Sequence, residues 1–351
     1  NTNLKSEIKE EIKNLKQCDD DFLMAFDATS LYPSAMSDDD SEFPDIRSAR
    51  VFKPEEESEF LKLFNSKKFR PRTGFFDIRY HYPPDNFLQH LPVKDIILDK
   101  GKKFEVNRFR NGYARDVLTS VDIQEIVETG GEILNIYEGI VYERNLPQSP
   151  FKYFIQKLFN LRKRYKYEEN QVGDEMVKLL MNSLYGKTIQ RDGDYQMFIW
   201  NTSTLQKNYD DLIIMRTEIQ KDVWVVKRKK DRKGIDVTSE EAKEGILKPS
   251  KKHKNSFQPP VHFGSFILAH SKRIMNKFIK AIDGFKKPSV YYSDTDSIYI
   301  SKKYYDQLNT LGYVGGNMGQ GKNDYGEGGI IFGRYIAPKI KYNIVLNDGM
   351  I

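Results

Sequence analysis

The chain has 351 residues, of which 39% are hydrophobic and 30% charged, a composition typical of a folded globular protein with two or three packed units. This composition excludes fibrous and disordered proteins. The sequence has no apolar run of about 18 residues, so it predicts no membrane-spanning helix. The charged N-terminus does not resemble a secretory signal, so we expect an intracellular protein without a membrane partner, in the cytoplasm or the nucleus.

Cysteine and histidine are scarce. The sequence has one cysteine, Cys18, and five histidines, which excludes a disulfide framework and a cysteine-based zinc site. A metal ion would therefore need carboxylate ligands, which hard cations such as Mg²⁺ prefer.

The first part of the chain predicts a helix followed by a buried strand. Apolar residues recur at helical spacing in residues 4–17, which predicts a short amphipathic helix. The apolar run Phe22–Asp27 predicts a buried strand that ends in a carboxylate. Pro33 fixes φ and predicts a turn at Leu31–Ser34. Strand-like alternation follows in residues 74–80 and 132–142.

Two consecutive helices are predicted in the middle of the chain, after the proline-bounded segment 147–150. Apolar residues in 151–165 follow helical spacing between Lys and Arg, which predicts a helix that is basic on one side. A break at residues 170–173 separates it from a second predicted helix at residues 174–185. The two helices predict a helical hairpin.

The net charge of +6 arises in one segment. Residues 227–254 carry 11 Lys or Arg and 5 Asp or Glu, and the rest of the chain holds 45 of each sign. Such a block is typical of a solvated loop and also of a surface that a polyanion passes. Beyond it, residues 263–282 predict a long amphipathic helix, and two β-rich runs predict a hairpin whose acidic turn is Asp294-Thr295-Asp296.

The acidic turn and the strand end at Asp27 are candidate parts of one metal site. Aspartates in hairpin turns commonly satisfy only backbone amides, but the apolar runs on both sides would hold these carboxylates rigidly. Adjacent strand ends lie about 5 Å apart, so Asp27 could approach the turn. Close carboxylates repel one another unless divalent cations lie between them, and paired Mg²⁺ ions about 3.5–4 Å apart serve nucleotidyl transfer.

A second candidate is the helix face with Lys178, Asn182 and Tyr185, at i, i+4 and i+7. Such a stripe is often only solvated, but a cation, an amide and an aromatic ring suit a triphosphate and a stacked base. Arg162 and Lys166, one turn apart on the preceding helix, would add positive charge for a polyphosphate.

Three segments resemble, in order and spacing, the motifs of family B DNA polymerases, and within them the protein-primed type of viruses, phages and linear plasmids. Residues 27–34 are similar to motif A (DxxSLYPS), residues 178–186 to motif B (KxxxNSxYG) and residues 292–297 to motif C (YxDTDS). The resemblance extends over about residues 21–345. It implies an α+β fold, the polymerase right hand, with an antiparallel-sheet palm, helical-hairpin fingers, inserted subdomains and a truncated or absent thumb.

The resemblance also implies a DNA-directed DNA polymerase, a nucleotidyltransferase of viral, phage or plasmid DNA replication, together with its site residues. The implied catalytic residues are Asp27, Asp294, Asp296 and Lys178. Asp27, Asp296 and the Ala28 carbonyl would bind two Mg²⁺ ions, for which Mn²⁺ could substitute, while Asp294 would support the site without bridging the metals.

Further residues are implied to bind nucleotide and DNA, and Tyr32 would exclude a 2′-OH. The implied nucleotide contacts are Ser30, Leu31, Tyr32, Arg162, Lys166, Lys178, Asn182 and Tyr185. The implied DNA contacts are Gly186, Thr295, Ser297, Lys339, Lys341 and Tyr342. Residues 334–342 are similar to the primer-contacting KxY motif with its tyrosine displaced by one residue, so the phosphate contact is either Lys339 or Lys341.

The implied partners are a DNA template-primer and dNTPs, with a terminal protein primer and a separate exonuclease or missing N-terminal domain as further candidates.

The predicted division is an N-terminal helix (1–20), palm (21–36), an insertion that resembles the terminal-protein region with palm elements (37–150), fingers (151–190), a basic insertion (191–260), palm (261–345) and a truncated end (346–351). A loop or hairpin at residues 224–254 would touch template or displaced strand.

Some features leave alternatives open. The 26 residues before Asp27 are too few for an exonuclease domain, so we expect a chain that does not proofread. The lack of an initiator Met leads us to expect a fragment of a longer protein. Such a fragment could be a catalytically impaired nucleic-acid-binding module. An RNA-primed family B enzyme also stays open, because Ser293, where those enzymes usually have Gly, is the one position against it. The DTD turn and the NSxYG helix disfavour a reverse transcriptase or an unrelated two-metal nuclease.

Overall fold

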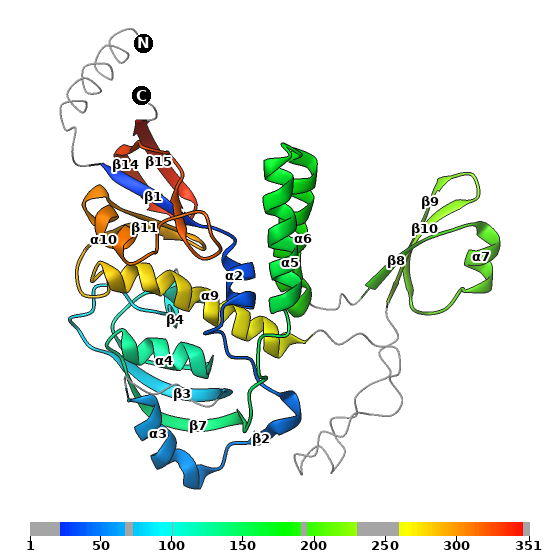
Figure 1. The fold of residues 1–351 in the computed structure, drawn as a ribbon. Coiled ribbons are helices and arrows are strands. Elements are labelled where there is room, and N and C mark those ends of the chain that lie inside the picture. Colours follow the sequence, from blue (N-terminus) through cyan, green and yellow to red (C-terminus); the bar gives the residue numbers. More distant parts are fainter. Residues whose placement is uncertain (1–21, 67–72, 100, 191–194, 230–259, 347–351) are drawn as a thin grey trace. The chain divides into compact units, whose positions relative to one another are not determined.

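A computed structural model describes residues 22–66, 73–99, 101–190, 195–229 and 260–346. The chain divides into two compact units, residues 1–186 with 262–351 and residues 187–261. Both units contain helices and antiparallel sheets, which confirms the predicted α+β class (Figure 1). None of the helices in the described ranges has the length and apolar character needed to cross a bilayer. The helix predicted at residues 4–17 lies outside these ranges.

The larger unit contains a six-stranded antiparallel sheet. Strands β11, β12, β1, β14 and β15 lie in that order, and β13 pairs with the end of β1. Their bounds are β1 (Leu23–Ala28), β11 (Val290–Asp294), β12 (Ser297–Ser301), β13 (Gly321–Asn323), β14 (Gly329–Ala337) and β15 (Ile340–Leu346). The apolar side chains of β1 are largely buried, as the sequence predicted. Because β1 is paired on both sides, it holds Asp27 between β12 and β13.

Helices α2 (Leu31–Ser37), α9 (Val261–Ala281) and α10 (Tyr305–Thr310) pack with β1 in one hydrophobic core, to which the helical segments 152–167 and 171–189 also contribute. Helix α9 confirms the long amphipathic helix predicted near the same residues. The turn predicted around Pro33 was wrong, because α2 contains this proline in its first turn. A proline is tolerated there since the first amides of a helix have no intrahelical acceptor.

A second hydrophobic core lies in the insertion between motifs A and B. Its four-stranded sheet has the order β2, β7, β3, β6, and β4 pairs with β5. The elements are β2 (Ala49–Val51), α3 (Glu57–Phe64), β3 (Gly74–Tyr82), β4 (Val93–Asp99), β5 (Lys102–Arg108), β6 (Gly112–Thr119), α4 (Ser120–Glu128) and β7 (Glu132–Tyr142). Short 3₁₀ helices lie at Ile46–Ser48, Pro54–Glu56 and, in the palm, Lys302–Tyr304. The two predicted strands are confirmed as β3 and β7.

Helix α9 joins the two cores. Phe266 of α9 packs against Phe75 of β3, with ring centroids 5.4 Å apart, and Lys272 Nζ lies 2.5 Å from the buried carboxylate of Asp122 in α4. Burial alone would raise the pKa of Asp122, but Lys272 and His90 hold it below its usual range. The buried charge is thus paired, and the insertion is fixed to the sheet that carries the candidate site.

Helices α5 (Lys152–Tyr167) and α6 (Gln171–Ile189) form the predicted helical hairpin (Figure 1). Helix α6 begins earlier than predicted, because Asn170 caps it and accepts a hydrogen bond from the Gly173 amide at 2.9 Å. Gly173 was expected to break the helix, but it lies in the first turn. A Cβ there would lie 2.7 Å from the Tyr165 ring, so the close approach of the two helices requires glycine.

The smaller unit contains a three-stranded sheet of order β8, β10, β9 and a short helix. Its elements are β8 (Tyr195–Trp200), α7 (Thr202–Lys207), β9 (Ile213–Gln220) and β10 (Val223–Lys229). The hairpin or loop predicted at residues 224–254 begins in the central strand of this sheet, where Val226 is buried. Residues 230–254 of that basic segment lie outside the described residues.

Candidate active site

The structure brings the acidic parts of motifs A and C together. Asp27 is next to last in β1, and its backbone pairs with Ser297, the first residue of β12. The amide of Ala28 donates a hydrogen bond to the Asp296 carbonyl at 2.7 Å. Asp27 and Asp296 therefore lie side by side across two hydrogen-bonded strands.

The electrostatics of Asp27 reflect this convergence. The pKa of Asp27 is raised to about 6, mainly by burial and also by the charges of Asp296 and Asp324. Lys178 of α6 opposes the rise, so its ammonium group is close enough to interact with Asp27. A carboxylate with two acidic neighbours favours a bound cation or a proton.

Asp324 is a site residue that sequence reasoning missed. It follows β13, and its amide donates a hydrogen bond to the Ala25 carbonyl of β1 at 2.9 Å. Burial raises the pKa of Asp324, as does Asp296, whereas Lys341 lowers it. No motif marks this aspartate, and only the pairing of β13 with β1 places it beside Asp27.

The donor set fits a magnesium site that is completed by substrate. Within the described ranges, no three His, Cys, Asp or Glu side chains converge closely enough to hold a metal ion by themselves. Asp27, Asp296 and the Ala28 carbonyl would therefore need water and phosphate oxygens as further ligands. Mg²⁺ is commonly bound in this way, through one or two carboxylates and substrate phosphates.

Asp294 has a different environment from Asp296. Lys339 Nζ donates to both carboxylate oxygens of Asp294, at 2.9 and 3.0 Å, and the Thr295 hydroxyl donates to one of them at 3.1 Å. Lys339 thereby lowers the pKa of Asp294. This pairing supports a role for Asp294 beside the metal site rather than as a bridging ligand. Thr295 has φ 57°, a strained conformation for a β-branched residue.

The segment similar to the KxY motif forms the β14–β15 hairpin, which packs on motif C. The rings of Tyr292 and Tyr335 stack with centroids 5.0 Å apart. Lys341 Nζ lies over the Tyr299 ring, 4.6 Å from its centroid, and also donates to the Tyr299 hydroxyl. Tyr342 is exposed. Lys341 is thus held by aromatic rings, whereas Lys339 is exposed apart from its ion pair.

Tyrosines of motifs A and B meet near Asp296. Tyr32 and Tyr185 stack with ring centroids 4.2 Å apart and an angle of 11° between the rings. Burial raises the pKa of Tyr32, and Asp296 adds to the rise. Lys178 and Asn182 are exposed on α6. A Cβ at Gly186 would meet no atom within 4 Å, so the surface there has room for a ligand.

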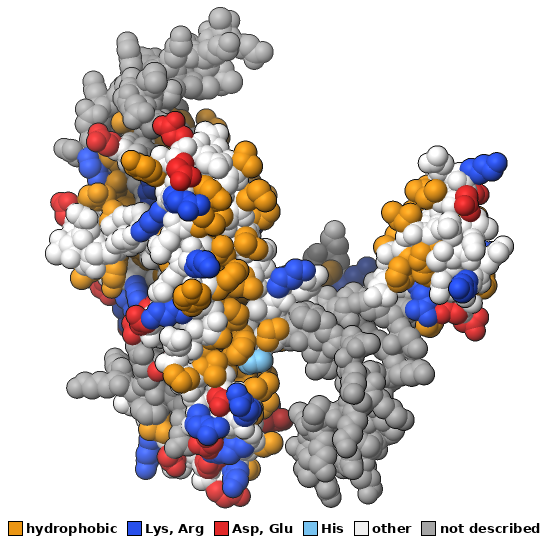
Figure 2. Space-filling view, turned by 45° about the vertical axis from the view of Figure 1, so that its right-hand side comes forward, with side chains coloured by type: hydrophobic (Ala, Val, Ile, Leu, Met, Phe, Trp, Pro, Cys, Tyr) orange, Lys and Arg blue, Asp and Glu red, His pale blue; other side chains and the backbone are white. Residues whose placement is uncertain are grey.

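The fingers hairpin leaves much of its surface exposed. Hydrophobic side chains gather on the larger unit, and on α5 and α6 the exposed ones include Tyr153, Val172, Met176 and Leu179 (Figure 2). The polar residues Lys178 and Asn182 of α6 are exposed as well, so this face of the helix is accessible. Leu31, by contrast, has its side chain in the core, so the predicted nucleotide contact at this position could be made only by its backbone.

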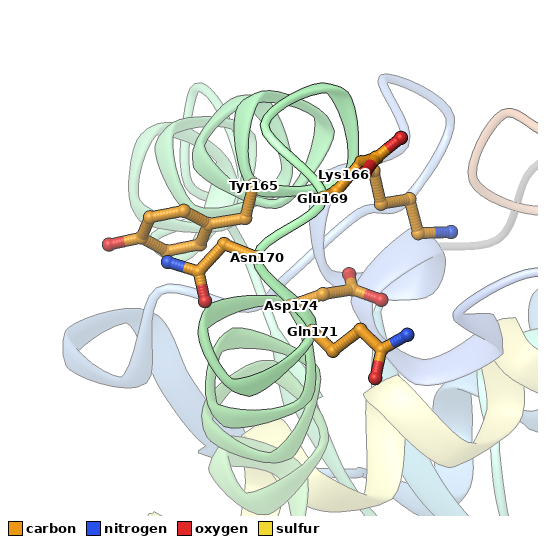
Figure 3. A pocket seen from close by; sticks show the side chains of 6 residues that line it. All are labelled: Tyr165, Lys166, Glu169, Asn170, Gln171 and Asp174. Atoms are coloured by element: carbon orange, nitrogen blue, oxygen red, sulfur yellow. The ribbon is translucent and has the colours of Figure 1, made fainter.

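The two cations predicted on α5 lie in different environments. Arg162 Nε donates to Asp174 Oδ1 at 2.6 Å, and Arg162 Nη1 donates to the Ser30 hydroxyl at 3.3 Å. Ser30 has φ 51° at the start of α2. Lys166 lines a pocket near the tip of the hairpin, where its side chain and those of Gln171 and Asp174 point to the same side (Figure 3).

Comparisons with known proteins agree with this arrangement. Residues 13–285 match the family described as DNA polymerase type B, organellar and viral. A DNA polymerase of Kluyveromyces lactis is 24% identical over 289 residues, which are 81% of this chain and 24% of that protein. The chain thus spans about a quarter of this relative.

Two solved structures share the fold. Phi29 DNA polymerase in an orthorhombic crystal form has a TM-score of 0.55 and 16% identity, covering 94% of this chain and 47% of its own. Phi29 DNA polymerase complexed with primer-template DNA and incoming nucleotide substrates has a TM-score of 0.54 and 16% identity, covering 93% and 46%. The family match covers most of the chain, including motifs A and B. The chain therefore belongs to the type B DNA polymerases of the organellar and viral kind.

Proposed function

We propose that this chain catalyses DNA-directed DNA synthesis, in which dNTPs are added to a primer 3′-OH by two-metal nucleotidyl transfer. The observation that carries the proposal is the convergence of Asp27 and Asp296 at the end of strand β1, where the charge of Lys178 on α6 also acts on Asp27. Family membership supports the same reaction. The Phi29 enzyme in the related structure is complexed with primer-template DNA and incoming nucleotide, which supports these partners for this chain.

In the proposed mechanism, Asp27, Asp296 and the Ala28 carbonyl would hold Mg²⁺. The metal would lower the pKa of the primer hydroxyl and neutralise charge on the triphosphate. Lys178 would face the phosphates and supply a proton to the leaving pyrophosphate. The Tyr32–Tyr185 stack would shape the floor of the pocket under the sugar and the nascent base pair. The protein mainly positions the reactants and compensates charge, as in other phosphoryl transfers.

The proposal includes protein priming, with a terminal protein as a further partner. Two observations support it. The family is described as organellar and viral, and the insertion between motifs A and B folds around its own hydrophobic core, as a binding subdomain would. The same chain on a nucleic-acid primer is the alternative, so both primers belong in the assay.

Primer extension by the purified chain tests the proposal, with Mg²⁺ or Mn²⁺ and with DNA-primed and protein-primed templates. Loss of a group that stabilises the transition state costs about 3 kcal/mol or more, so Asp27→Asn and Asp296→Asn should lower the extension rate at least about 100-fold while DNA binding persists. Asp85→Asn is the matched control, because Asp85 forms an exposed ion pair with Lys286 and belongs to neither motif A nor motif C.

Near-normal extension by either site variant would contradict the assignment of these carboxylates. Binding of template-primer without extension by the unaltered chain, on both kinds of primer, would instead indicate a nucleic-acid-binding module. This alternative is tested because the chain spans about half of the structures that it resembles.

A further inference from the structure

Asp174 is a carboxylate near the proposed nucleotide site, where positively charged side chains would bind a triphosphate better. It lies in the first turn of α6 and lines the hairpin pocket together with Lys166, a cavity of about 350 Å³ (Figure 3). An unpaired carboxylate there would repel phosphate. The side chain of Asp174 is only 21% exposed, so its charge needs a partner within the protein.

The partner of Asp174 is Arg162, and the contact uses one edge of the guanidinium group. Arg162 Nε lies 2.6 Å from Asp174 Oδ1, and the Arg162 side chain is 11% exposed. Nη1 lies on another edge and reaches the Ser30 hydroxyl of motif A at 3.3 Å. Because the guanidinium group is planar and rigid, fixing the Nε edge also fixes the direction of the terminal nitrogens.

We propose that Asp174 is a positioning residue that directs Arg162 toward the motif A loop, where Arg162 binds the triphosphate of the incoming nucleotide. This inference rests on the proposed function and assigns the nucleotide-binding part of that site. The ion pair has two effects. It neutralises Asp174, which then does not repel the nucleotide, and it leaves the terminal nitrogens of Arg162 available for phosphate oxygens.

The contact with Ser30 explains how Arg162 is kept in place before a nucleotide binds. The Ser30 hydroxyl is a neutral acceptor at 3.3 Å, which is weaker than a charged phosphate oxygen. A triphosphate could therefore replace Ser30 as the acceptor of Nη1 while the contact with Asp174 persists. Asp174 would then hold Arg162 in a fixed position while Arg162 binds the phosphate.

A purely structural role for the same pair has a different consequence. Arg162 and Asp174 also connect α5 to α6, so their contact could serve only to hold the hairpin together. In that case its loss would lower the stability of the hairpin but would not change nucleotide affinity through Arg162. Nucleotide affinity, measured in a double-mutant cycle, separates the two roles.

The experiment measures binding of a fluorescent dATP analogue by the full chain on a template-primer that ends in a dideoxynucleotide, so no chemistry is required. We expect Asp174→Ala to weaken binding about tenfold, the equivalent of one charge-assisted hydrogen bond. Asp174→Asn keeps an oxygen acceptor for Nε and should lose less. Arg162→Ala should weaken binding at least as much, and adding Asp174→Ala to it should weaken binding no further.

Glu168→Ala is the matched control, since Glu168 pairs with Arg164 on the same hairpin at 3.5 Å and should leave affinity unchanged. Unchanged or tighter binding by folded Asp174→Ala, or an equal loss in the Arg162→Ala background, would overturn the inference. Thermal unfolding checks the fold, and if Asp174→Ala is unfolded, unchanged affinity in Asp174→Asn, which removes the negative charge, would overturn the inference. A chain that binds the analogue but does not extend a primer contradicts only the proposed function, whereas a chain that binds no nucleotide contradicts both.

Discussion

Tyr32 of motif A and Tyr185 of motif B stack almost in parallel, with ring centroids 4.2 Å apart. One ring belongs to α2 of motif A and the other to α6 of the fingers hairpin, so the contact connects motif A to motif B. A stacked aromatic pair contributes about 0.5–1.5 kcal/mol beyond its buried area. The position of Tyr32 therefore depends on Tyr185.

The first prediction concerns sugar selection. Tyr185→Ala removes the ring that holds Tyr32, and we expect it to raise the KM for dNTP about three- to tenfold and to increase ribonucleotide incorporation. Tyr185→Phe keeps the ring and should stay near the unaltered chain. Single-nucleotide incorporation with dNTP and rNTP measures both effects. Unchanged discrimination in Tyr185→Ala would show that Tyr32 is held by other contacts.

The second prediction concerns the stability of the metal-free protein. The pKa of Asp27 is raised to about 6 from an ordinary value of 3.8, so folding favours the protonated side chain. The stability that protonated Asp27 contributes is complete below about pH 3.8 and is lost as the pH rises through about 6. We expect metal-free Asp27→Asn to be more stable than the unaltered chain at pH 7.5.

Denaturant unfolding of both proteins in EDTA checks this prediction at pH 7.5 and pH 4. At pH 4 the difference should shrink, because Asp27 is then largely protonated in the folded state. Asp85→Asn is again the control, since that carboxylate lies in an exposed ion pair. If the difference in stability is the same at both pH values, it arises from the substitution itself and not from the titration of Asp27, which contradicts the prediction.

The third prediction concerns Asp324. Its charge contributes to the raised pKa of Asp27, so Asp324→Asn should lower that pKa. Binding of Mn²⁺ to the site, followed by electron paramagnetic resonance, should then reach its plateau at a lower pH than in the unaltered chain. Glu327→Gln, three residues away, is the control. A pH profile shared by both proteins would show that Asp324 does not influence the metal site.

The sequence predicted the parts of the site that depend on local pattern. The apolar run before Asp27 predicted a buried strand, and the apolar flanks of the acidic turn predicted the hairpin that carries Asp296. These patterns are strong because a central strand must bury both faces. The local pattern allowed β1 to pair with β12 but did not specify this pairing, because the two strands lie far apart in the sequence.

The remaining features depend on contacts between distant segments. Asp324 reaches the site because β13 pairs with β1, and no local pattern predicts that pairing. Helix α2 was missed because Pro33 is a helix breaker everywhere except in the first turn, where the structure places it. The ion pair of Asp174 with Arg162 joins two helices, and spacing along one helix cannot predict it.

The fourth prediction decides between Lys339 and Lys341 as the primer contact. The Lys339 side chain is exposed and its ammonium group pairs with Asp294, so a primer phosphate can compete for it. Lys341 is packed on the rings of Tyr292 and Tyr299, and this contact contributes about 1 kcal/mol to folding. We therefore expect Lys339→Ala to weaken binding of template-primer and to reduce the slope of log K against log salt by about 0.9.

Lys341→Ala should behave in the opposite way, with a loss of about 1 kcal/mol in the free energy of unfolding and little change in the salt slope. Titrations of labelled template-primer at several salt concentrations, together with denaturant unfolding, separate the two residues. Lys302→Ala is a suitable control, because Lys302 also lies over an aromatic ring, that of Phe22, but outside motif C. If Lys341→Ala flattens the salt slope and Lys339→Ala does not, the phosphate contact belongs to Lys341, and the ion pair of Lys339 with Asp294 serves only to hold the turn.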